Sequence, residues 1–286
     1  MRISSSGWLN GMIGVALFSG SMPATRAAVT GFAPLFLTGA RATIAATLAG
    51  ATLLTLRQRR PARADMLPLA IIAMGAIIGF PLLTAIALQH ITAARSLVFV
   101  GLLPLSTAIF GVLRGGERPH PAFWLFALTG ASAVAGFALG KGADGSATGD
   151  GLMVAAVVLC GLAYAEGGVL SRRLGGWQVI SWALVLCAPL GLALAVATWP
   201  ATLATVPVQA WAGLIYVSIF TMLLGFIFWY RGLALGGIAK VAQLQLLQPF
   251  MGLGLSAFFL RETVAPSMLA VTVAVVLCVG GARRYA

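Results

Sequence analysis

Two charged residues of this sequence, Glu166 and Arg41, lie inside long apolar runs. A charged side chain at the centre of a membrane costs roughly 2.5–3.5 kcal/mol, so such a residue usually faces a cavity or a partner. Glu166 could carry a proton or contact an amine, but it also lies close enough to Arg172 and Arg173 to reach the interface. Arg41 could bind a carboxylate, or it could satisfy broken backbone near the end of its run. Their expected depths differ by about 10 Å, which argues against a direct pair between them.

Uncharged polar groups inside apolar runs form a second set of candidates. Gln245 and Gln248 are three residues apart and share a helix face, where they could line a cavity or hydrogen-bond to a neighbouring helix. Hydroxyl groups inside runs belong to Ser19, Ser21, Tyr164 and Thr221. Four prolines interrupt runs and free backbone carbonyls, and binding sites in membrane carriers tend to form at such interruptions: Pro81, Pro104, Pro189 and Pro249.

Motifs that would indicate an enzyme or a metal site are missing from the sequence. It contains no G-x-S-x-G, no H-E-x-x-H and no G-x-x-x-x-G-K-[ST]. The two histidines, His90 and His120, lie near the ends of runs, and no cluster has the spacing of metal ligands. The cysteines lie singly inside apolar runs, as small core residues do: Cys160, Cys187 and Cys278. We therefore predict no catalytic residue, no metal and no cofactor, which leaves gradient-driven transport or passive conduction.

The composition identifies the elements that must position these side chains. Of the 286 residues, 60% are apolar and 8% are charged, and the mean hydropathy is +1.01. A soluble globular protein has roughly 25% charged residues. The sequence therefore predicts an all-α, polytopic membrane protein of ten transmembrane helices, because ten apolar runs have about the length of a membrane span: 8–29, 32–56, 67–89, 92–113, 121–140, 151–171, 178–198, 211–231, 238–260 and 266–282.

The net charge is +12, and the basic residues lie mainly in the connections between these runs. Alternate connections, together with both termini, hold 13 of the 18 basic residues, and the other set holds four. Because positive residues concentrate on the cytoplasmic side, both termini are expected to be cytoplasmic. No basic stripe alternates with aromatic residues on a polar face, so nucleic acid is not expected as a partner.

An offset of 145 residues superposes the two halves of the sequence. It aligns four pairs of uncommon residues: Arg95 with Lys240, Pro104 with Pro249, Glu117 with Glu262, and Pro121 with Pro266. Each repeat, 1–141 and 146–286, would hold five helices, and an odd number inverts the second copy in the membrane. We expect Arg95 and Lys240 to lie at lipid headgroups and the two glutamates to tie each helix to the next.

Several fragments resemble the EamA repeat of the drug/metabolite transporter superfamily. The fragments are Leu102-Leu103-Pro104 with Gly116-Glu117-Arg118, Leu247-Gln248-Pro249 with Arg261-Glu262, Gly39-Ala40-Arg41, and Leu162-Ala163-Tyr164 with Ser171-Arg172-Arg173. The ten-span layout is most similar to amino-acid exporters of that superfamily. The resemblance implies a secondary transporter in the bacterial inner membrane that exports small metabolites, amino acids including aromatic or apolar ones, by alternating access.

The resemblance also implies a central cavity with walls from spans one, three, four, six, eight and nine. In this sequence those walls would contribute Ser19, Ser21, Phe80, Phe99, Tyr164, Thr221, Gln245 and Gln248. A mixture of aromatic rings, hydroxyls and amides suits an amphiphilic solute. The partners expected are a small-molecule substrate and the lipid bilayer, and the oligomeric state is open. Broad drug or metabolite efflux and a channel-like facilitator are the alternative functions.

Overall fold

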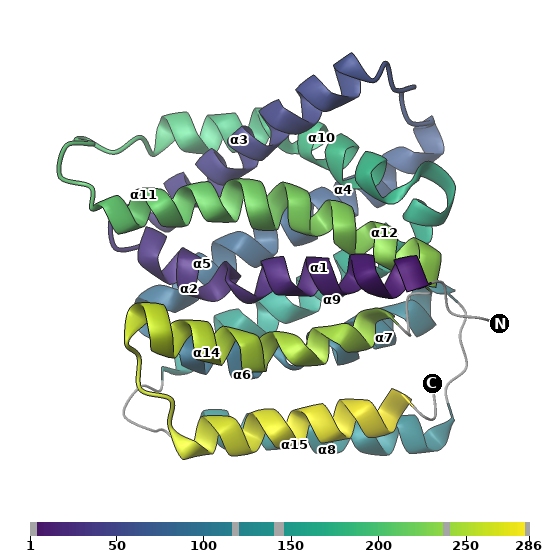
Figure 1. Ribbon diagram of the computed structural model, residues 1–286, viewed down its shortest axis with the longest axis vertical. Helices are drawn as coiled ribbons and strands as arrows, with labels where there is room; N and C mark the ends of the chain where they lie inside the picture. The colour runs from purple at the N-terminus through teal and green to yellow at the C-terminus, as the bar shows by residue number, and fades with distance from the viewer. Residues whose placement is uncertain (1–4, 116–119, 140–145, 237–240, 284–286) are drawn as a thin grey trace.

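The computed structural model describes residues 5–115, 120–139, 146–236 and 241–283, and every regular element in these ranges is helical (Figure 1). In a bilayer a helix satisfies its own backbone hydrogen bonds, which favours it in so apolar a chain. The elements are α1 Ser5–Ser19, α2 Ser21–Ala28, α3 Pro34–Thr55, η1 Arg63–Asp65, α4 Met66–Ile72, η2 Ala73–Gly79, α5 Phe80–His90, α6 Ala93–Val100, α7 Leu103–Gly115, α8 Pro121–Leu139, α9 Ala147–Leu174, α10 Gly176–Ala197, α11 Val208–Ile215, η3 Tyr216–Gly225, α12 Phe226–Gly236, η4 Gln243–Leu247, α14 Gln248–Leu260 and α15 Pro266–Arg283.

Six helical stretches in the described ranges are long and apolar enough to cross a membrane, which confirms a multi-pass membrane protein. They are Pro34–Thr55, Arg63–His90, Ala93–Arg114, Ala147–Leu174, Gly176–Ala197 and Val208–Gly236. Two further apolar helices, Leu244–Leu260 and Pro266–Cys278, are shorter. The first expected span is divided at Gly20, between α1 and α2. Six stretches in the described ranges thus meet the length and hydropathy of a membrane span, and the count of ten spans stays a prediction.

The helices are arranged with one pair along each edge of the bundle and the others between these pairs (Figure 1). α3 packs along α10 at one edge, and α8 packs along α15 at the other. Each pair consists of helices that the 145-residue offset relates to one another. The central contacts recur in the same way, because α1 packs on α12 and their counterparts α9 and α5 pack on each other.

Interruptions of the central helices also recur at this offset. The π-helix η2 is matched by the π-helix η3, which contains the residues 145 positions later. The break between α6 and α7 is matched by the 3-10 segment η4 before α14. Three of the four expected prolines, Pro81, Pro104 and Pro249, lie just after these interruptions, whereas Pro189 lies within the continuous α10. A proline in a membrane helix does not by itself end the helix, because neighbouring groups can satisfy the freed carbonyl.

Glycines allow α1 and α12 to approach each other closely. A Cβ atom placed on Gly232 would lie 2.7 Å from the backbone nitrogen of Gly11, and one on Gly7 would lie 2.8 Å from that of Gly236. Small residues are the usual means of close packing between membrane helices, where apolar surface gains little by leaving lipid. This contact brings the second half of the chain against the first.

α6 and α14 pack along each other in opposite directions, because the end of α14 meets the start of α6. The residue that follows α14 by two positions, Glu262, accepts hydrogen bonds from the first residues of α6. α1 begins and α15 ends at the same end of the bundle, on the right in Figure 1. The last turn of α9 meets the connection from α3 to α4, because Arg173 of α9 pairs with Asp65 of η1.

Candidate substrate site

A small cavity lies between central helices from both halves of the chain, near the middle of their length. Its volume is about 20 Å³, which is room for one water molecule. Six of the ten residues predicted for the site line it: Ser21, Arg41, Phe80, Tyr164, Thr221 and Gln248. Pro81, which the sequence marked as an interruption, also lines it, and the lining residues that sequence reasoning missed are Phe18, Ala76, Leu103 and Phe226.

The lining residues include three pairs related by the 145-residue offset. They are Ala76 with Thr221, Pro81 with Phe226, and Leu103 with Gln248. Each pair lies at an interruption: the first in η2 and η3, the second just after them, and the third at the starts of α7 and α14. The cavity is therefore lined by equivalent places of the two repeats. The positions 145 residues before the predicted Thr221 and Gln248 are Ala76 and Leu103, so the repeat in the sequence could have identified both.

Arg41 brings a positive charge to this cavity from the first half of α3. Its side chain is 5% exposed. One terminal nitrogen donates to the Thr221 hydroxyl at 3.1 Å and lies 3.4 Å from the Val217 carbonyl oxygen, while Nε has no hydrogen-bond partner in the described residues. Both contacts are in η3, so both sequence hypotheses, a site for an anion and satisfaction of broken backbone, remain compatible with the geometry.

Gln248 offers the cavity an amide with one group unsatisfied. Its nitrogen lies 3.5 Å from the carbonyl oxygen of Phe18, and its Oε1 has no hydrogen-bond partner among the residues described. The residue opens α14, directly after the 3-10 segment. A buried acceptor without a donor is unfavourable, so this oxygen is suited to receive a donor from a bound solute.

Aromatic rings form one wall of the cavity. The Phe18 ring lies 5.1 Å from that of Phe226, 6.2 Å from that of Trp229 and 6.4 Å from that of Tyr164, measured between centroids. Trp229 is fully buried behind Phe18 and Phe226. The contacts of Phe18 with Phe226 and Trp229 are edge-to-face and that with Tyr164 is stacked; edge-to-face and offset-stacked contacts are favourable for aromatic groups, and the same surface would accept the apolar part of a solute.

Three of the predicted cavity residues lie elsewhere. Ser19 is fully buried and donates to the carbonyl oxygen of Val15 in its own helix. Phe99 is fully buried in a different apolar cluster. Gln245 is 1% exposed, and neither of its amide atoms has a hydrogen-bond partner in the described part of the chain. None of the three lines the cavity, and Gln243 on the same segment has a side chain outside the described set.

Glu166, the second charged candidate, is not among the residues that line the cavity. Its carboxylate pairs with Arg114, near the end of α7, and is itself buried. Arg173, which the interfacial hypothesis used to mark the nearby interface, pairs with Asp65. Arg41 and Glu166 do not pair with each other, as the depth argument indicated.

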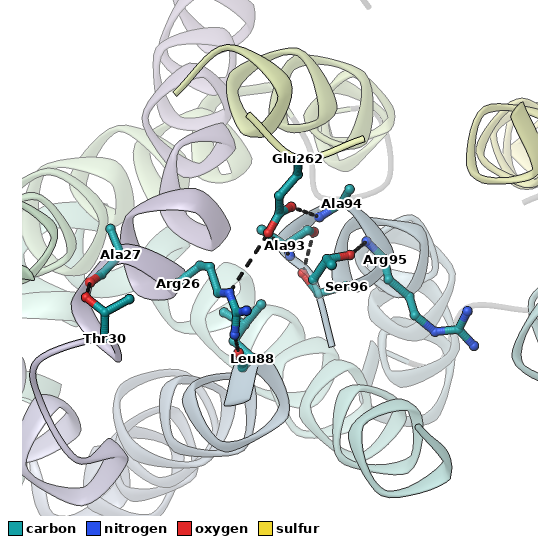
Figure 2. A network of polar contacts seen from close by, with 10 residues as sticks. Arg26, Ala27, Thr30, Leu88, Ala93, Ala94, Arg95, Ser96 and Glu262 are labelled. Atoms are coloured by element: carbon teal, nitrogen blue, oxygen red, sulfur yellow. Dashed lines mark hydrogen bonds and ion pairs between the residues drawn. The ribbon is translucent and has the colours of Figure 1, made fainter. Parts of the chain in front are cut away.

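A polar network joins four helices at the opposite end of the bundle from the start of α1 (Figure 2). The Glu262 carboxylate accepts from the backbone nitrogens of Ala93 and Ala94 at 3.1 and 2.9 Å. Arg26, at the end of α2, lies 3.9 Å from this carboxylate and also donates to the carbonyl oxygen of Leu88 in α5. A carboxylate is favourable at the positive N-terminal end of a helix. Glu262 therefore connects α14 to α6 and to α2, whereas the expected role was only to connect α14 to the next helix, α15.

Arg95 is not at the lipid headgroups, contrary to expectation. It is 2% exposed and forms a bidentate pair with Asp150, with bonds of 2.9 and 2.7 Å. Asp150 comes from the first turn of α9, 55 residues later in the chain. The expectation was wrong because sequence spacing does not show which helix ends meet. Lys240 and Glu117, the counterparts of Arg95 and Glu262, lie outside the described residues.

The comparisons with known proteins agree with this arrangement. The EamA-like transporter family matches residues 5–139 and again residues 147–282. The uncharacterized transporter YdeK of Bacillus subtilis (strain 168) is 58% identical over 286 residues, which is the full length of both chains. A probable terminal-alkyne amino-acid exporter of Streptantibioticus cattleyicolor is 24% identical over 275 residues, 94% of this chain and 90% of that protein.

A solved crystal structure with 21% sequence identity has the same fold, with a TM-score of 0.69 over 97% of this chain and 95% of that one. Two family matches in one chain, and 58% identity to a transporter over its full length, confirm the resemblance that the sequence motifs indicated. The protein is thus a membrane transporter and not an enzyme, and it belongs to the EamA-like transporter family.

Proposed function

We propose that this transporter is a secondary exporter of small metabolites, amino acids including aromatic or apolar ones, and that it works by alternating access. The observation that carries the proposal is the central cavity, lined by equivalent residues of the two repeats at the interruptions of their helices. Carriers built from inverted repeats bind their substrates at the repeat interface beside discontinuous helices.

The proposed architecture is ten spans in two inverted five-helix repeats, 1–141 and 146–286, in the bacterial inner membrane. α6 and α14 belong to predicted spans four and nine, which the offset relates, and their opposite directions support the inversion. An even number of spans places both termini on one side, and the basic connections favour the cytoplasm. Reporter fusions at residues 60 and 145 should then lie on opposite sides of the membrane, and finding both on one side would contradict this topology.

The chemistry of the cavity supports an amphiphilic substrate. Tyr164, Phe18 and Phe226 provide an apolar wall, while Ser21, Thr221 and Gln248 provide hydroxyl and amide groups. An amino acid with an apolar side chain has this division into polar and apolar parts. The relation to a probable terminal-alkyne amino-acid exporter points to the same class of solute.

The present volume of about 20 Å³ is too small for an amino acid. Binding therefore requires the halves to separate on one side, and the interrupted helices provide the places to bend. A π-segment leaves backbone carbonyls displaced from the regular ladder, and such segments are common at functional sites. The two π-segments contribute Ala76 and Thr221 to the wall of the cavity, so a bend in either one changes its shape.

Transport in liposomes tests the proposal. Purified protein is reconstituted into liposomes, and the liposomes are loaded with one unlabelled compound at a time, either an aromatic, aliphatic, polar or charged amino acid or one of several drugs. Uptake of a labelled amino acid should be saturable and accelerated by internal substrate. Acceleration by several drugs and no amino acid would favour broad efflux, and flux without saturation or acceleration would favour a channel-like facilitator. Either outcome would overturn amino-acid export.

A further inference from the structure

Arg41 is the one charged side chain that lines the central cavity, and the chain has no carboxylate beside it in the ranges the structure describes. The four described acids are each paired with another arginine: Asp65 with Arg173, Asp150 with Arg95, Glu166 with Arg114, and Glu262 with Arg26. The remaining acids of the sequence, Glu117 and Asp144, lie in connections between the predicted spans, outside the described residues.

A buried charge is retained in a membrane protein when something compensates it. Thr221 and the Val217 carbonyl contribute partial charges to one guanidinium nitrogen, and Nε is left without an acceptor. The compensation from the protein is therefore incomplete. A planar guanidinium binds a carboxylate through two parallel hydrogen bonds, which is the geometry that would use the free donors.

We infer that Arg41 anchors the carboxylate of the substrate, so that the transporter selects carboxylates over their uncharged or amidated analogues. This inference rests on the proposed function and specifies its substrate class. Gln248 completes the site, because its unsatisfied Oε1 can accept from the ammonium group of a zwitterion. The side chain of the solute then lies on Phe18, Tyr164 and Phe226.

The opposing explanation is that Arg41 holds the backbone of η3 in place. In that case its only role is the bond to the Val217 carbonyl oxygen, and the affinity for ligands would not depend on Arg41. The two explanations differ in what removing the guanidinium does. A role in η3 lowers the melting temperature of the empty protein, whereas a role as an anchor lowers the affinity for carboxylates.

Ligand-induced thermal stabilisation of the purified protein measures affinity without requiring transport. The probes are phenylalanine and phenylalaninamide, which share a side chain and an amine and differ in the carboxylate. The variants are Arg41→Met, which removes the charge, and Arg41→Lys, which keeps the charge and loses the planar fork. Thr38→Val is the matched control, because Thr38 is buried one turn earlier in α3 and does not line the cavity.

The parent and Thr38→Val should bind phenylalanine roughly 10- to 100-fold more tightly than phenylalaninamide, as expected for hydrogen bonds to a charged group. Arg41→Met should lose this preference, because it weakens the binding of phenylalanine and leaves that of phenylalaninamide unchanged. Arg41→Lys should retain part of the preference. A parent that binds acid and amide equally, or an Arg41→Met protein that keeps the preference, would overturn the inference. If Arg41→Met does not fold, an Arg41→Lys protein with undiminished preference would overturn it.

The liposome assay separates this inference from the proposed function. Preference for the carboxylate in binding, together with no flux of any amino acid, would leave Arg41 as an anion anchor and refute amino-acid export. Saturable amino-acid counterflow with no preference for the acid over the amide would support export and refute the anchor.

Discussion

Replacing Glu262 with glutamine should loosen the closure at one end of the bundle. The carboxylate accepts from the Ala93 and Ala94 nitrogens at 3.1 and 2.9 Å and lies 3.9 Å from Arg26. Glutamine keeps one neutral carbonyl acceptor. One of the two hydrogen bonds to the start of α6 is therefore lost, and the other has a neutral acceptor in place of a charged one. The interaction with Arg26 is lost as well.

The size of this loss follows from the geometry. Bonds that involve a charged acceptor contribute about 1.5–3 kcal/mol and neutral ones about 1 kcal/mol. The Arg26 side chain is 36% exposed, so screening limits its part to a fraction of about 1 kcal/mol. The closed arrangement should therefore lose at least about 2 kcal/mol, which is roughly a 30-fold or larger shift toward opening.

The rate of cysteine labelling at the cavity measures that opening. A cysteine at Ser21, introduced into a background without the three native cysteines, is buried in the closed protein and lines the cavity. Glu262→Gln should raise its rate of reaction with a polar thiol reagent roughly 30-fold or more, following the shift above. Thr263→Val, a change at the exposed neighbour, should leave the rate unchanged. Equal rates in the parent and in Glu262→Gln would refute the role assigned to these bonds.

Two further predictions concern stability and are measured as melting temperatures in one detergent. Asp150→Asn should destabilise the protein by about 3 kcal/mol or more, because it removes the charge from a buried bidentate pair with Arg95; an unchanged melting temperature would contradict that importance. Gly232→Val should cost about 1–3 kcal/mol by crowding the backbone of Gly11, whereas Gly254→Ala, where a Cβ has no neighbour within 4 Å, should be neutral or stabilising. Equal effects of the two glycine substitutions would argue against the close approach of α1 and α12.

Hydropathy predicted the helices because the membrane imposes one length and one composition on every span. The sites of interruption were predictable in part. Pro81, Pro104 and Pro249 mark three of them, but no residue pattern marks a π-helix, whose extra residue depends on what the neighbouring helices allow. Pro189 shows the limit of the rule, since α10 continues through it.

The site was predictable to the extent that polar residues are rare in apolar spans. Thr221, Gln248 and Arg41 were found in this way, and all three line the cavity. Phe99 was misplaced because α6 is buried on all sides, so its apolar pattern does not reveal which face meets the cavity. The partners of Arg95 and Glu262 were missed because they come from distant helices, and their meeting depends on the packing of helix ends.

The measurement that tests the central claim most directly is amino-acid counterflow after the cavity has been filled. Ala76 lines the cavity from the first repeat, and the cavity has a volume of about 20 Å³. The larger side chain of Ala76→Leu would fill this space, which has room for one water molecule. Ala270→Leu adds the same atoms to the exposed surface of α15 and serves as the control. With folding verified by melting temperature and equal amounts reconstituted, we predict counterflow at the level of empty liposomes for Ala76→Leu and at the parental level for Ala270→Leu. Parental counterflow by Ala76→Leu would contradict transport through this cavity.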